Sequence, residues 1–306
     1  MPKPIAVICS DLHLHYAPPI KRIGDWQGDM GKSLNFVSQL ANKHKVPVIC
    51  CGDLFHSAQE SPSVELLMLD FINGISSGFY AIPGQHDMRN HRADLEGTSY
   101  KLLQKALNGD ARVNLTDDVT CLDLVSSKNV DIKLWFVPWG KLSGLPPLVR
   151  KGSDSQYMGL IAHELTFTKS FPNSLETMDW FDNFPNVDFF CVGDNHKSFL
   201  KRYKHRFFLS PGSLMNRATD QLERNPFVYL LYSDLSLKRI ANRHEAEAEF
   251  QDAVSISHSA EVEKFCGAFD RGDHEQISFY HALQSRRMKE TGRVREILDE
   301  LEGMLR

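Results

Sequence analysis

The stretch Gly84-Gln85-His86-Asp87 places an amide, an imidazole and a carboxylate side by side, directly after the apolar run at residues 79–82. A strand that ends in glycine and is followed by polar side chains is typical of the carboxyl edge of an α/β sheet, where ligands bind. Four other apolar runs end in a similar way, in the order Asp-x-His, Gly-Asp, His-Glu and Gly-Asp-Asn-His. Together the five segments offer enough oxygen and nitrogen donors to bind two metal ions.

Strand-like and helix-like patterns alternate in the first third of the chain. The apolar runs lie at residues 5–9, 47–51 and 79–82. Amphipathic stretches that begin at Ser33 and at Pro62 separate them, and this alternation predicts a parallel sheet with helical crossovers. We interpret residues 15–32, which contain several glycines and prolines, as a loop, and residues 93–107 as a further helix.

Strands follow one another closely from residue 112 onward. Runs at residues 119–125 and 130–137 flank a short polar segment and predict a hairpin. Further apolar runs lie at residues 158–162, 187–192 and 227–232. We therefore predict an α/β fold in which two packed β-sheets are flanked by helices.

The composition changes again near residue 240. We place a catalytic domain in residues 1–240 and a small helical C-terminal extension in residues 241–306, which serves as a reduced cap, as partner-docking helices, or as both. The run at residues 244–249 has no apolar face, so we interpret it as a solvated connector. Residues 294–305 have apolar positions at helical spacing and predict an amphipathic helix.

The overall composition limits the classes of protein. The chain has 306 residues, of which 42% are hydrophobic, and a net charge of −4. This balance excludes nucleic-acid binding through overall charge alone, so any such contact needs a local basic patch. No run approaches the roughly 20 apolar residues of a membrane span, and we expect a cytoplasmic protein without membrane contact. We interpret the cysteines, which form no C-x-x-C pair, as buried hydrophobic residues.

The polar residues at the strand ends are candidate metal ligands. They are Asp11, His13, Asp53, Gln85, His86, His163, Asp194 and His196. A mixed oxygen and nitrogen set without thiolates suits Mn²⁺, Mg²⁺, Fe or Zn²⁺ and disfavours a closed structural zinc site. One carboxylate can bridge two ions about 3.5–4 Å apart, and such a pair can hold a hydroxide for in-line attack on phosphorus. The first motif, taken alone, has an alternative interpretation. In it Asp11 caps a turn and His13 is a surface residue.

This ordered series of motifs resembles the calcineurin-like metallophosphoesterases. The motifs are Asp11-x-His13, Gly52-Asp53, Gly84-Gln85-His86-Asp87, His163 and Gly193-Asp194-Asn195-His196. Within that family the chain looks closest to the SbcD-type DNA repair nucleases of bacteria and phages. Three segments favour that branch, namely Asp53-Leu54-Phe55-His56, His163-Glu164-Leu165 and Ser210-Pro211-Gly212-Ser213. The resemblance covers about residues 5–232 and implies a two-metal phosphodiesterase that hydrolyses DNA.

The resemblance also implies a role for each matching residue. The first metal is held by Asp11, His13 and His196. Asp53 bridges the two metals, and the second metal is held by Gln85, His163 and Asp194. His86 acts as general acid or stabilises the leaving oxygen, and His56 positions the scissile strand or the transition state. Asp87 either orients His86 or caps the next turn.

Two positions depart from the family pattern, and both belong to the second metal. The family more often has Asn where Gln85 stands and His where Asp194 stands. Gln85 reaches farther, and Asp194 adds a negative charge that favours Mn²⁺ or Mg²⁺ over Zn²⁺. We therefore expect two divalent ions, with Mn²⁺ preferred, and a second metal that is held differently from the family norm.

Basic residues follow the last ligand motif directly and predict contact with DNA or RNA. The candidate nucleic-acid-binding residues are Lys197, Lys201, Arg202, Tyr203, Lys204 and Arg206, together with Arg89 and Arg92. The alternative is a solvated hairpin. The resemblance implies that residues 294–305 dock on an SbcC-like coiled-coil ATPase. The alternative is that this helix packs on the protein's own core. The sequence also leaves a homodimer open. Two other functions stay open, a phosphoesterase for a small phosphate ester or nucleotide and a non-catalytic scaffold.

Overall fold

The computed structural model describes residues 2–19, 22–92, 94–127, 130–145, 148, 156–169, 171, 174–217 and 226–247. The chain divides into two units, Met1–Gln251 and Asp252–Arg306, and the second lies wholly outside the described residues. The predicted helix at residues 294–305 therefore stays a prediction, as does the domain boundary at residue 240.

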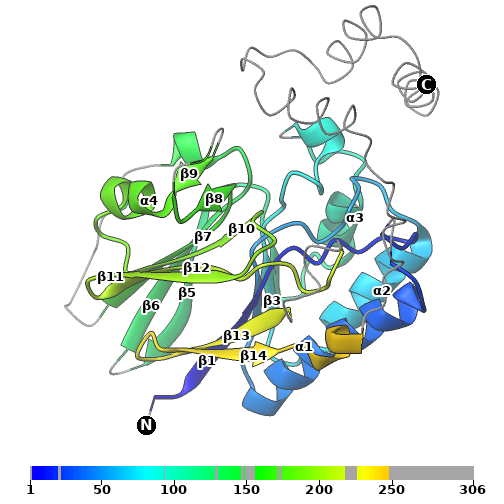
Figure 1. Cartoon of the computed structure of the whole chain (residues 1–306), viewed down its shortest axis with the longest axis horizontal. Coiled ribbons are helices and arrows are strands. Elements are labelled where there is room, and N and C mark those ends of the chain that lie inside the picture. The colour runs from blue at the N-terminus through cyan, green and yellow to red at the C-terminus, as the bar shows by residue number, and fades with distance from the viewer. Residues whose placement is uncertain are drawn as a thin grey trace, which may run out of the picture. The chain divides into compact units, whose positions relative to one another are not determined.

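The first sheet has six strands in the order β14-β13-β1-β2-β3-β4. Figure 1 labels four of them, β14, β13, β1 and β3. Its strands are β1 (Pro4–Cys9), β2 (Val48–Cys50), β3 (Phe79–Ala81), β4 (Val113–Leu115), β13 (Phe227–Tyr232) and β14 (Leu237–Ala241). Strands β1 to β4 run parallel, as the alternation of patterns predicts, whereas β13 pairs with β1 and β14 in antiparallel fashion. The carboxyl ends of β1, β2 and β3 consequently meet at one edge of the sheet.

Three helices lie on the outer face of this sheet. They are α1 (Trp26–His44), α2 (Pro62–Asn73) and α3 (Ser99–Ala106). Helix α1 begins seven positions earlier than predicted, so the interpretation of residues 15–32 as a loop is wrong for its second half. The Asp25 side chain caps this helix by accepting from the Gly28 N–H at 3.0 Å, and Trp26 and Met30 are buried. The predicted helix at residues 93–107 is shorter than expected, because Thr98 caps α3.

The second sheet has six strands in the order β11-β12-β10-β7-β6-β5. Its strands are β5 (Thr120–Ser127), β6 (Val130–Val137), β7 (Gln156–His163), β10 (Phe189–Gly193), β11 (Phe199–Tyr203) and β12 (Arg206–Ser210). The predicted hairpin of β5 and β6 is confirmed. Helix α4 (Thr177–Asn183) and the short strands β8 (Thr166–Phe167) and β9 (Leu175–Glu176) lie between β7 and β10 in the chain. Short 3-10 turns occur at Arg89–His91, Leu142–Gly144 and Arg243–Glu247.

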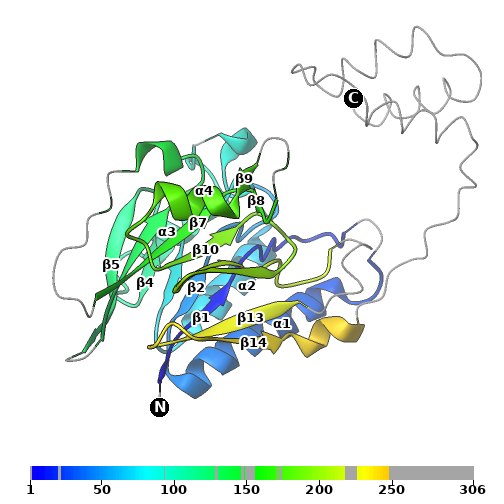
Figure 2. The same ribbon diagram turned by 60° about the vertical axis from the view of Figure 1, so that its left-hand side comes forward.

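The elements form four layers, helices, sheet, sheet and helix (Figure 2). Alternate residues of β1 face opposite sides, so Val7 packs towards α1 and α2 whereas Ile8 packs between the sheets. The space between the sheets is filled by residues such as Ile161 and Phe189. Trp180 of α4 packs on the far side of the second sheet. The predicted fold of two packed sheets flanked by helices is confirmed.

The segment after β14 differs from its prediction as a solvated connector. The Glu245 carboxylate is buried and forms an ion pair with the buried guanidinium of Arg22, with Arg22 Nη1 2.7 Å from Glu245 Oε2. The connector interpretation is therefore wrong at Glu245. The prediction of buried cysteines is likewise wrong at Cys121, which is exposed on the edge strand β5. Among the described residues, no helix combines the length and apolar character needed to cross a membrane.

Candidate active site

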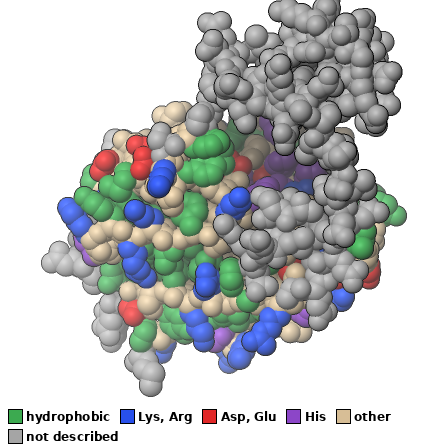
Figure 3. All heavy atoms as spheres, viewed as in Figure 1, with side chains coloured by type: hydrophobic (Ala, Val, Ile, Leu, Met, Phe, Trp, Pro, Cys, Tyr) green, Lys and Arg blue, Asp and Glu red, His purple; other side chains and the backbone are tan. Residues whose placement is uncertain are grey.

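The polar residues at the strand ends come from both sheets and lie together. Asp11, Asp53 and Gln85 follow β1, β2 and β3 of the first sheet, and His163 and Asp194 stand at the ends of β7 and β10 of the second. Direct contacts join the two groups, because His163 Nδ1 lies 2.7 Å from the Cys51 carbonyl oxygen and the Asp194 N–H donates to Asp11 at 3.2 Å. Figure 3 shows histidine side chains gathered in a hollow of the surface.

The backbone at four of the candidate ligands is turned and not extended. Asp11, His13, Asp53 and Asp194 all have positive φ angles, between 45° and 82°. A left-handed residue turns the chain sharply, and such strained positions cluster at functional sites. Asp11 and His13 thus face the same site through turned backbone and not through strand alternation.

The candidate ligands of the first metal lie within reach of one ion. Asp11, His13 and His196 each offer a donor atom, and these atoms lie within 4.8 Å of one another. His13 Nε2 and His196 Nε2 are 2.9 Å apart, and each lies 3.8 Å from Asp11 Oδ1. Asp53 Oδ2 lies 3.5 Å from His13 Nε2 and 3.3 Å from His163 Nε2, so its carboxylate stands between two sets of donors.

Four buried atoms of the candidate ligands lack a hydrogen-bond partner among the described residues. They are Asp53 Oδ2, Gln85 Oε1, His163 Nε2 and His13 Nδ1. Unsatisfied buried polar atoms are costly, and a cation coordinated by oxygen and imidazole nitrogen would satisfy the first three. The residues present therefore fit divalent metal ions, which when bound supply Lewis-acid activation of the phosphoryl group and the attacking water.

Gln85 and Asp194, the two departures from the family pattern, contact each other. Gln85 Nε2 donates to Asp194 Oδ1 at 2.6 Å. This hydrogen bond fixes which end of the amide carries the oxygen, and Gln85 Oε1 is left without a hydrogen-bond partner in the described part of the chain and free to act as a metal ligand. Asp194 therefore fixes the orientation of the Gln85 amide.

The buried charges shift one another's pKa values. Burial raises the pKa of Asp11, against the attraction of His163 and His196. Burial also acts to raise the pKa of Asp53, but the neighbouring His163 outweighs it and holds that pKa below its usual value. In His163, burial acts to lower the pKa, and the Asp53 carboxylate more than reverses this, raising the pKa to about 10.

His86 and His56 stand next to the candidate ligands with different hydrogen-bond partners. His86 Nδ1 lies 2.8 Å from the His56 carbonyl oxygen, so the Nδ1–H donates and Nε2 is not part of this hydrogen bond. The two rings stack, with centroids 5.2 Å apart. His56 Nδ1 instead accepts from Arg217 Nη2 at 2.9 Å, which places the proton of a neutral imidazole on Nε2.

Arg217 is a site residue that the sequence analysis missed. It follows β12, not one of the five strand ends, and its position after the Ser210-Pro211-Gly212-Ser213 motif is the only feature that could have indicated it. Burial, followed by the Arg217 guanidinium, lowers the pKa of His56 to about 4. His56 is therefore a neutral hydrogen-bond donor at physiological pH and not an imidazolium.

The catalytic role predicted for Asp87 needs correction. Its carboxylate is buried and accepts from the backbone N–H groups of Leu54, Phe55 and Gly84, at 2.9–3.1 Å. Its described hydrogen bonds are all to backbone, whereas the His86 ring is oriented by the His56 carbonyl. Asp87 joins the loops after β2 and β3, which agrees with the alternative interpretation as a turn cap.

The predicted nucleic-acid-binding residues fall into three groups. Lys197, Lys201, Arg202 and Lys204 are exposed on β11 and its flanks, and Arg89 and Arg92 are exposed around the turn after His86. Strand β12 runs parallel to β10, so the β11–β12 turn lies at the end of the sheet remote from the ligands. Only the beginning of the basic run, at Lys197, therefore lies beside the candidate ligands.

The third group consists of Arg206 and Tyr203, which pack inside the fold. Arg206 is buried and donates to the carbonyl oxygens of Phe181 and Phe184, at 2.9 and 3.1 Å. The Tyr203 ring lies 5.4 Å from the Phe181 ring. The predicted nucleic-acid contact of Arg206 is corrected, because its guanidinium holds α4 against the sheet.

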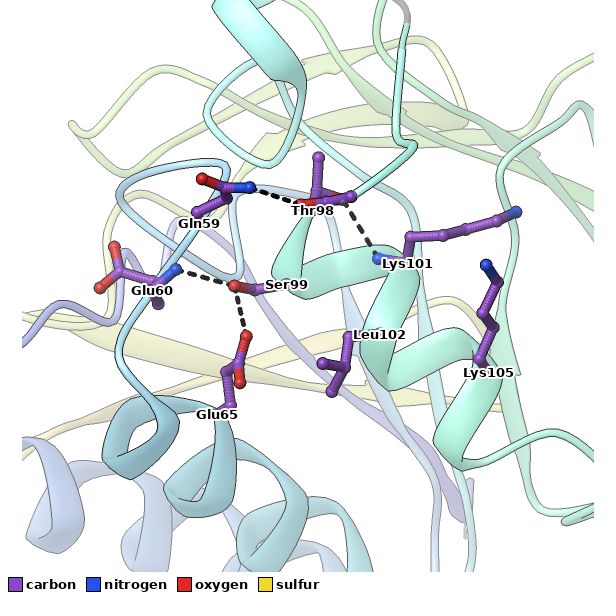
Figure 4. Close-up of a pocket in the computed structure, with 9 residues that line it drawn as sticks. Gln59, Glu60, Glu65, Thr98, Ser99, Lys101, Leu102 and Lys105 are labelled. Atoms are coloured by element: carbon purple, nitrogen blue, oxygen red, sulfur yellow. Dashed lines mark hydrogen bonds between the residues drawn. The ribbon is translucent and has the colours of Figure 1, made fainter.

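A cavity of about 520 Å³ lies beside the loop that carries His56 (Figure 4). Ser99 Oγ accepts from the Glu60 N–H and donates to Glu65, both at 2.8 Å. The Glu60 carboxylate instead pairs with His15 Nδ1 at 2.9 Å, and the His15 ring lies 5.1 Å from the His56 ring. Glu60 thus connects the lining of the cavity to His15 and, through the His15 ring, to His56. Acidic and basic side chains both line it, namely Glu60, Glu65, Lys101 and Lys105.

Comparison with known proteins agrees with this site. Residues 6–198 match the family model described as calcineurin-like phosphoesterase. The match spans more than half of the chain, so the protein belongs to this family of metal-dependent phosphoester hydrolases. No curated protein matches the sequence.

Several solved structures resemble the chain at low identity. The Plasmodium protein GAP50, described as the anchor in the inner membrane complex, has a TM-score of 0.51 and 12% identity over 85% of this chain and 93% of its own. A dimetal phosphatase from Danio rerio has a TM-score of 0.49 and 10% identity, with 78% and 99% covered. An archaeal phosphodiesterase has a TM-score of 0.43 and 13% identity, with 77% and 98% covered. Of these three structures, only GAP50 has a TM-score above 0.5, and at 12% identity this likeness shows the fold alone.

Proposed function

We propose that this phosphoesterase is a DNA-cutting phosphodiesterase of the SbcD type. The observation that carries the proposal is a run of exposed basic residues that begins beside the candidate ligands. Lys197 follows the ligand His196 directly, and Lys201 and Arg202 are exposed farther along β11. A protein with a net charge of −4 that places cations beside its site suits a polyanion whose phosphates need neutralising.

A second edge strand extends this basic surface. Strands β11 and β14 are the edges of their sheets, and the contact of Ser198 Oγ with the Tyr229 hydroxyl, at 2.5 Å, joins β11 to β13, the neighbour of β14. Lys238 and Arg239 of β14 are exposed. We name the four exposed cations Lys201, Arg202, Lys238 and Arg239 the basic edge. It gives a long substrate more than one phosphate contact, which a small phosphate ester does not need.

The assay for this proposal compares substrates in the presence of Mn²⁺. Linear double-stranded DNA, single-stranded DNA, bis-p-nitrophenyl phosphate and p-nitrophenyl phosphate are offered to the full chain. Cleavage of DNA and of the diester is the expected result. Activity confined to the monoester or to nucleotides would favour the small-ester alternative, and no activity on any substrate would favour a scaffold.

Charge reversal separates the basic edge from the chemistry. The double variant Lys201→Glu/Arg202→Glu should raise the KM for DNA and flatten its salt dependence, since each lost phosphate contact reduces the salt slope by about 1. Its hydrolysis of bis-p-nitrophenyl phosphate should stay unchanged. The matched control is Lys32→Glu/Lys43→Glu, on the exposed face of α1. If both double variants lower DNA cleavage equally, the basic edge has no special role.

The metal and the partner are further parts of the proposal. Two divalent ions, with Mn²⁺ preferred over Zn²⁺, suit a donor set in which Asp194 adds a hard, charged oxygen. An SbcC-like coiled-coil ATPase is the proposed partner, bound through residues 294–305, which lie outside the described residues. Gel filtration of a mixture with the ATPase, with and without residues 290–306, tests this. Co-elution that survives the truncation rules out the docking role.

A further inference from the structure

A second cavity lies on the outer side of the second sheet, between α4 and the loop after β6. Its volume is about 420 Å³, within the range of pockets that hold small organic groups. Much of its lining is apolar and comes from Leu142, Leu175, Trp180 and Phe184. Leu142, Leu175 and Phe184 are only partly buried by the protein itself. The cavity therefore offers an apolar surface to a ligand.

The lining of this cavity begins at the loops that carry the candidate ligands. Glu164 lines the cavity and follows the candidate ligand His163 directly. Gly140 lines it as well, and the N–H of the preceding Trp139 donates to the carbonyl oxygen of Pro83, in the loop after β3, at 3.2 Å. Loops of both sheets thus connect the cavity to the candidate active site. A group bound in the cavity can belong to the same substrate as the reacting phosphate.

The Glu164 carboxylate is the group that would give the cavity its specificity. It is half-buried, and it forms no hydrogen bond or ion pair with any residue that the structure describes. The Asp179 carboxylate also lines the cavity, but it accepts from the Glu176 N–H at 2.8 Å and caps α4. An ionised carboxylate accepts hydrogen bonds and donates none, so Glu164 needs a ligand with an N–H or O–H group.

An apolar surface with one carboxylate at its side suits a flat ring that has an amino group on its edge. Nucleobases have this form, and a glutamate accepts from the exocyclic amine of cytosine in protein–DNA contacts. Thymine has no amino group. A lysine side chain of a partner protein would also pair with Glu164, but it would leave the apolar lining without a matching ring.

We propose that this cavity binds an unpaired, amino-bearing nucleobase next to the scissile phosphate, and that Glu164 accepts from its exocyclic amine. We name the cavity the base pocket. The inference rests on the proposed cleavage of DNA and adds a base preference to it. The bound base must be outside a duplex, because in a duplex its amino group is already paired.

Nucleotide binding to the metal-loaded full chain tests the base pocket. Isothermal titration calorimetry should show that dCMP binds about tenfold more tightly than dTMP. In Glu164→Gln this preference should fall to within twofold, because an amide can turn to pair with either base. Asp182→Asn is the matched control, since it removes the same charge from the exposed face of α4 outside the cavity. It should keep the tenfold preference.

A second variant tests the apolar lining. Leu142→Ala should weaken the binding of dCMP and of dTMP about fivefold each, because the lost methyl groups contact either ring. The ratio of the two affinities should stay at its wild-type value. A change in the ratio would show that the apolar lining, and not Glu164, distinguishes the bases.

Cleavage of single-stranded oligonucleotides tests the base pocket during the reaction. With Mn²⁺, the wild type should cleave oligo(dC) with a kcat/KM about tenfold above that for oligo(dT) of equal length. Glu164→Gln should cleave the two with similar kcat/KM.

Three outcomes would overturn the inference. They are equal affinity of the wild type for dCMP and dTMP, a preference that Glu164→Gln keeps, and equal cleavage of the two oligonucleotides by the wild type. Failure of the proposed function has a different result, because the wild type would then cleave neither oligonucleotide. A preference for dCMP that depends on Glu164 would in that case support the base pocket as the site of a free nucleotide.

Discussion

His163 connects the two sheets at the level of a single side chain. Its Nδ1 contacts the Cys51 carbonyl of the first sheet, and its Nε2 lies 3.3 Å from Asp53 Oδ2. The Asp53 carboxylate raises the pKa of His163 to about 10, so the imidazole is protonated at neutral pH when no metal is bound. The resulting ion pair stabilises the metal-free fold below the ordinary pKa of 6.5, and this contribution disappears as the pH rises through about 10.

We predict that metal binding releases a proton from His163. A metal ligates neutral imidazole, so the bound ion must replace the proton that Asp53 retains, and the apparent metal affinity should rise with pH up to about 10. Calorimetric titration of Mn²⁺ at pH 7.5 in two buffers of different ionisation enthalpy measures the release. Identical heats in the two buffers would contradict the prediction. His205→Gln, in the exposed β11–β12 turn, is the control and should keep the release.

Asp194 orients Gln85, and we propose that it also offers an oxygen to the second metal. We predict that Asp194→Ala lowers the metal content from two ions to one per chain. The Gln85 amide loses its 2.6 Å hydrogen bond and with it the preferred position of Oε1. Metal analysis after dialysis measures this. Two ions at full occupancy in the variant would show that neither residue holds the second metal.

At the scale of elements, two glycines allow the strand ends to approach each other. A Cβ at Gly84 would lie 2.6 Å from His163 Nε2 and nearer still to the Asp53 carboxylate. A Cβ at Gly193 would collide with the Cys51 carbonyl oxygen and the Ser10 hydroxyl. The turn after β3 and the end of β10 therefore have room for glycine only.

We predict that Gly84→Ala abolishes metal binding, because the methyl group separates Asp53 from His163. The matched control is Gly31→Ala in α1, where nothing lies within 4 Å of the added Cβ. This control should keep both ions and stabilise the fold by about 0.5–1 kcal/mol, as alanine does relative to glycine inside a helix. Metal analysis and urea unfolding of both variants measure the effects. A Gly84→Ala protein with normal metal content would refute the argument.

The elements that could be predicted from sequence are those with local patterns. β1, β2 and β3 are apolar runs followed by polar residues, and both features lie within a few positions of each other. The start of α1 escaped detection because Gly28 and Gly31 lie inside the helix, although Asp25 is a helix cap by composition. The burial of Glu245 could not be predicted, since its partner Arg22 lies 223 positions away in the chain.

The candidate site shows the same contrast between features with a local sequence pattern and contacts between residues far apart in the chain. Candidate ligands stand at strand ends, so their grouping follows from the parallel sheet, whereas Arg217 reaches His56 from a loop through a contact that spans 161 positions. The roles of Asp87 and Arg206 were misjudged for a related reason. From the sequence, both side chains could contact a substrate or another side chain of the site. The folded structure shows that both instead form hydrogen bonds with backbone groups.

At the scale of the whole molecule, the candidate metal centre lies where the two sheets meet, at one end of the apolar core that fills the space between them. The first sheet contributes Asp11, His13, Asp53 and Gln85, and the second contributes His163, Asp194 and His196. A ligand that binds only the folded state stabilises it by RT ln(1 + [L]/Kd), which is about 2.7 kcal/mol at a concentration of 100 Kd.

We predict that Mn²⁺ protects the edges of both sheets at once. In hydrogen exchange followed by mass spectrometry, peptides that cover the ends of β1 and β2 and those that cover the ends of β7 and β10 should slow together when the metal is added. The β11–β12 turn, remote from the ligands, should exchange at the same rate with and without metal. Protection of one sheet alone would show that the ions do not bridge the sheets.

The left-handed backbone at Asp11, His13, Asp53 and Asp194 has an evolutionary consequence. Each is a conformation that glycine adopts without strain, so Asp53→Gly should yield a more stable metal-free protein than Asp53→Ala, measured by thermal unfolding. A lineage released from selection for hydrolysis would therefore drift towards glycine at these positions and gain thermal robustness. Aspartate and histidine at these four positions therefore cost the fold stability that a metal-free scaffold would have no reason to give up.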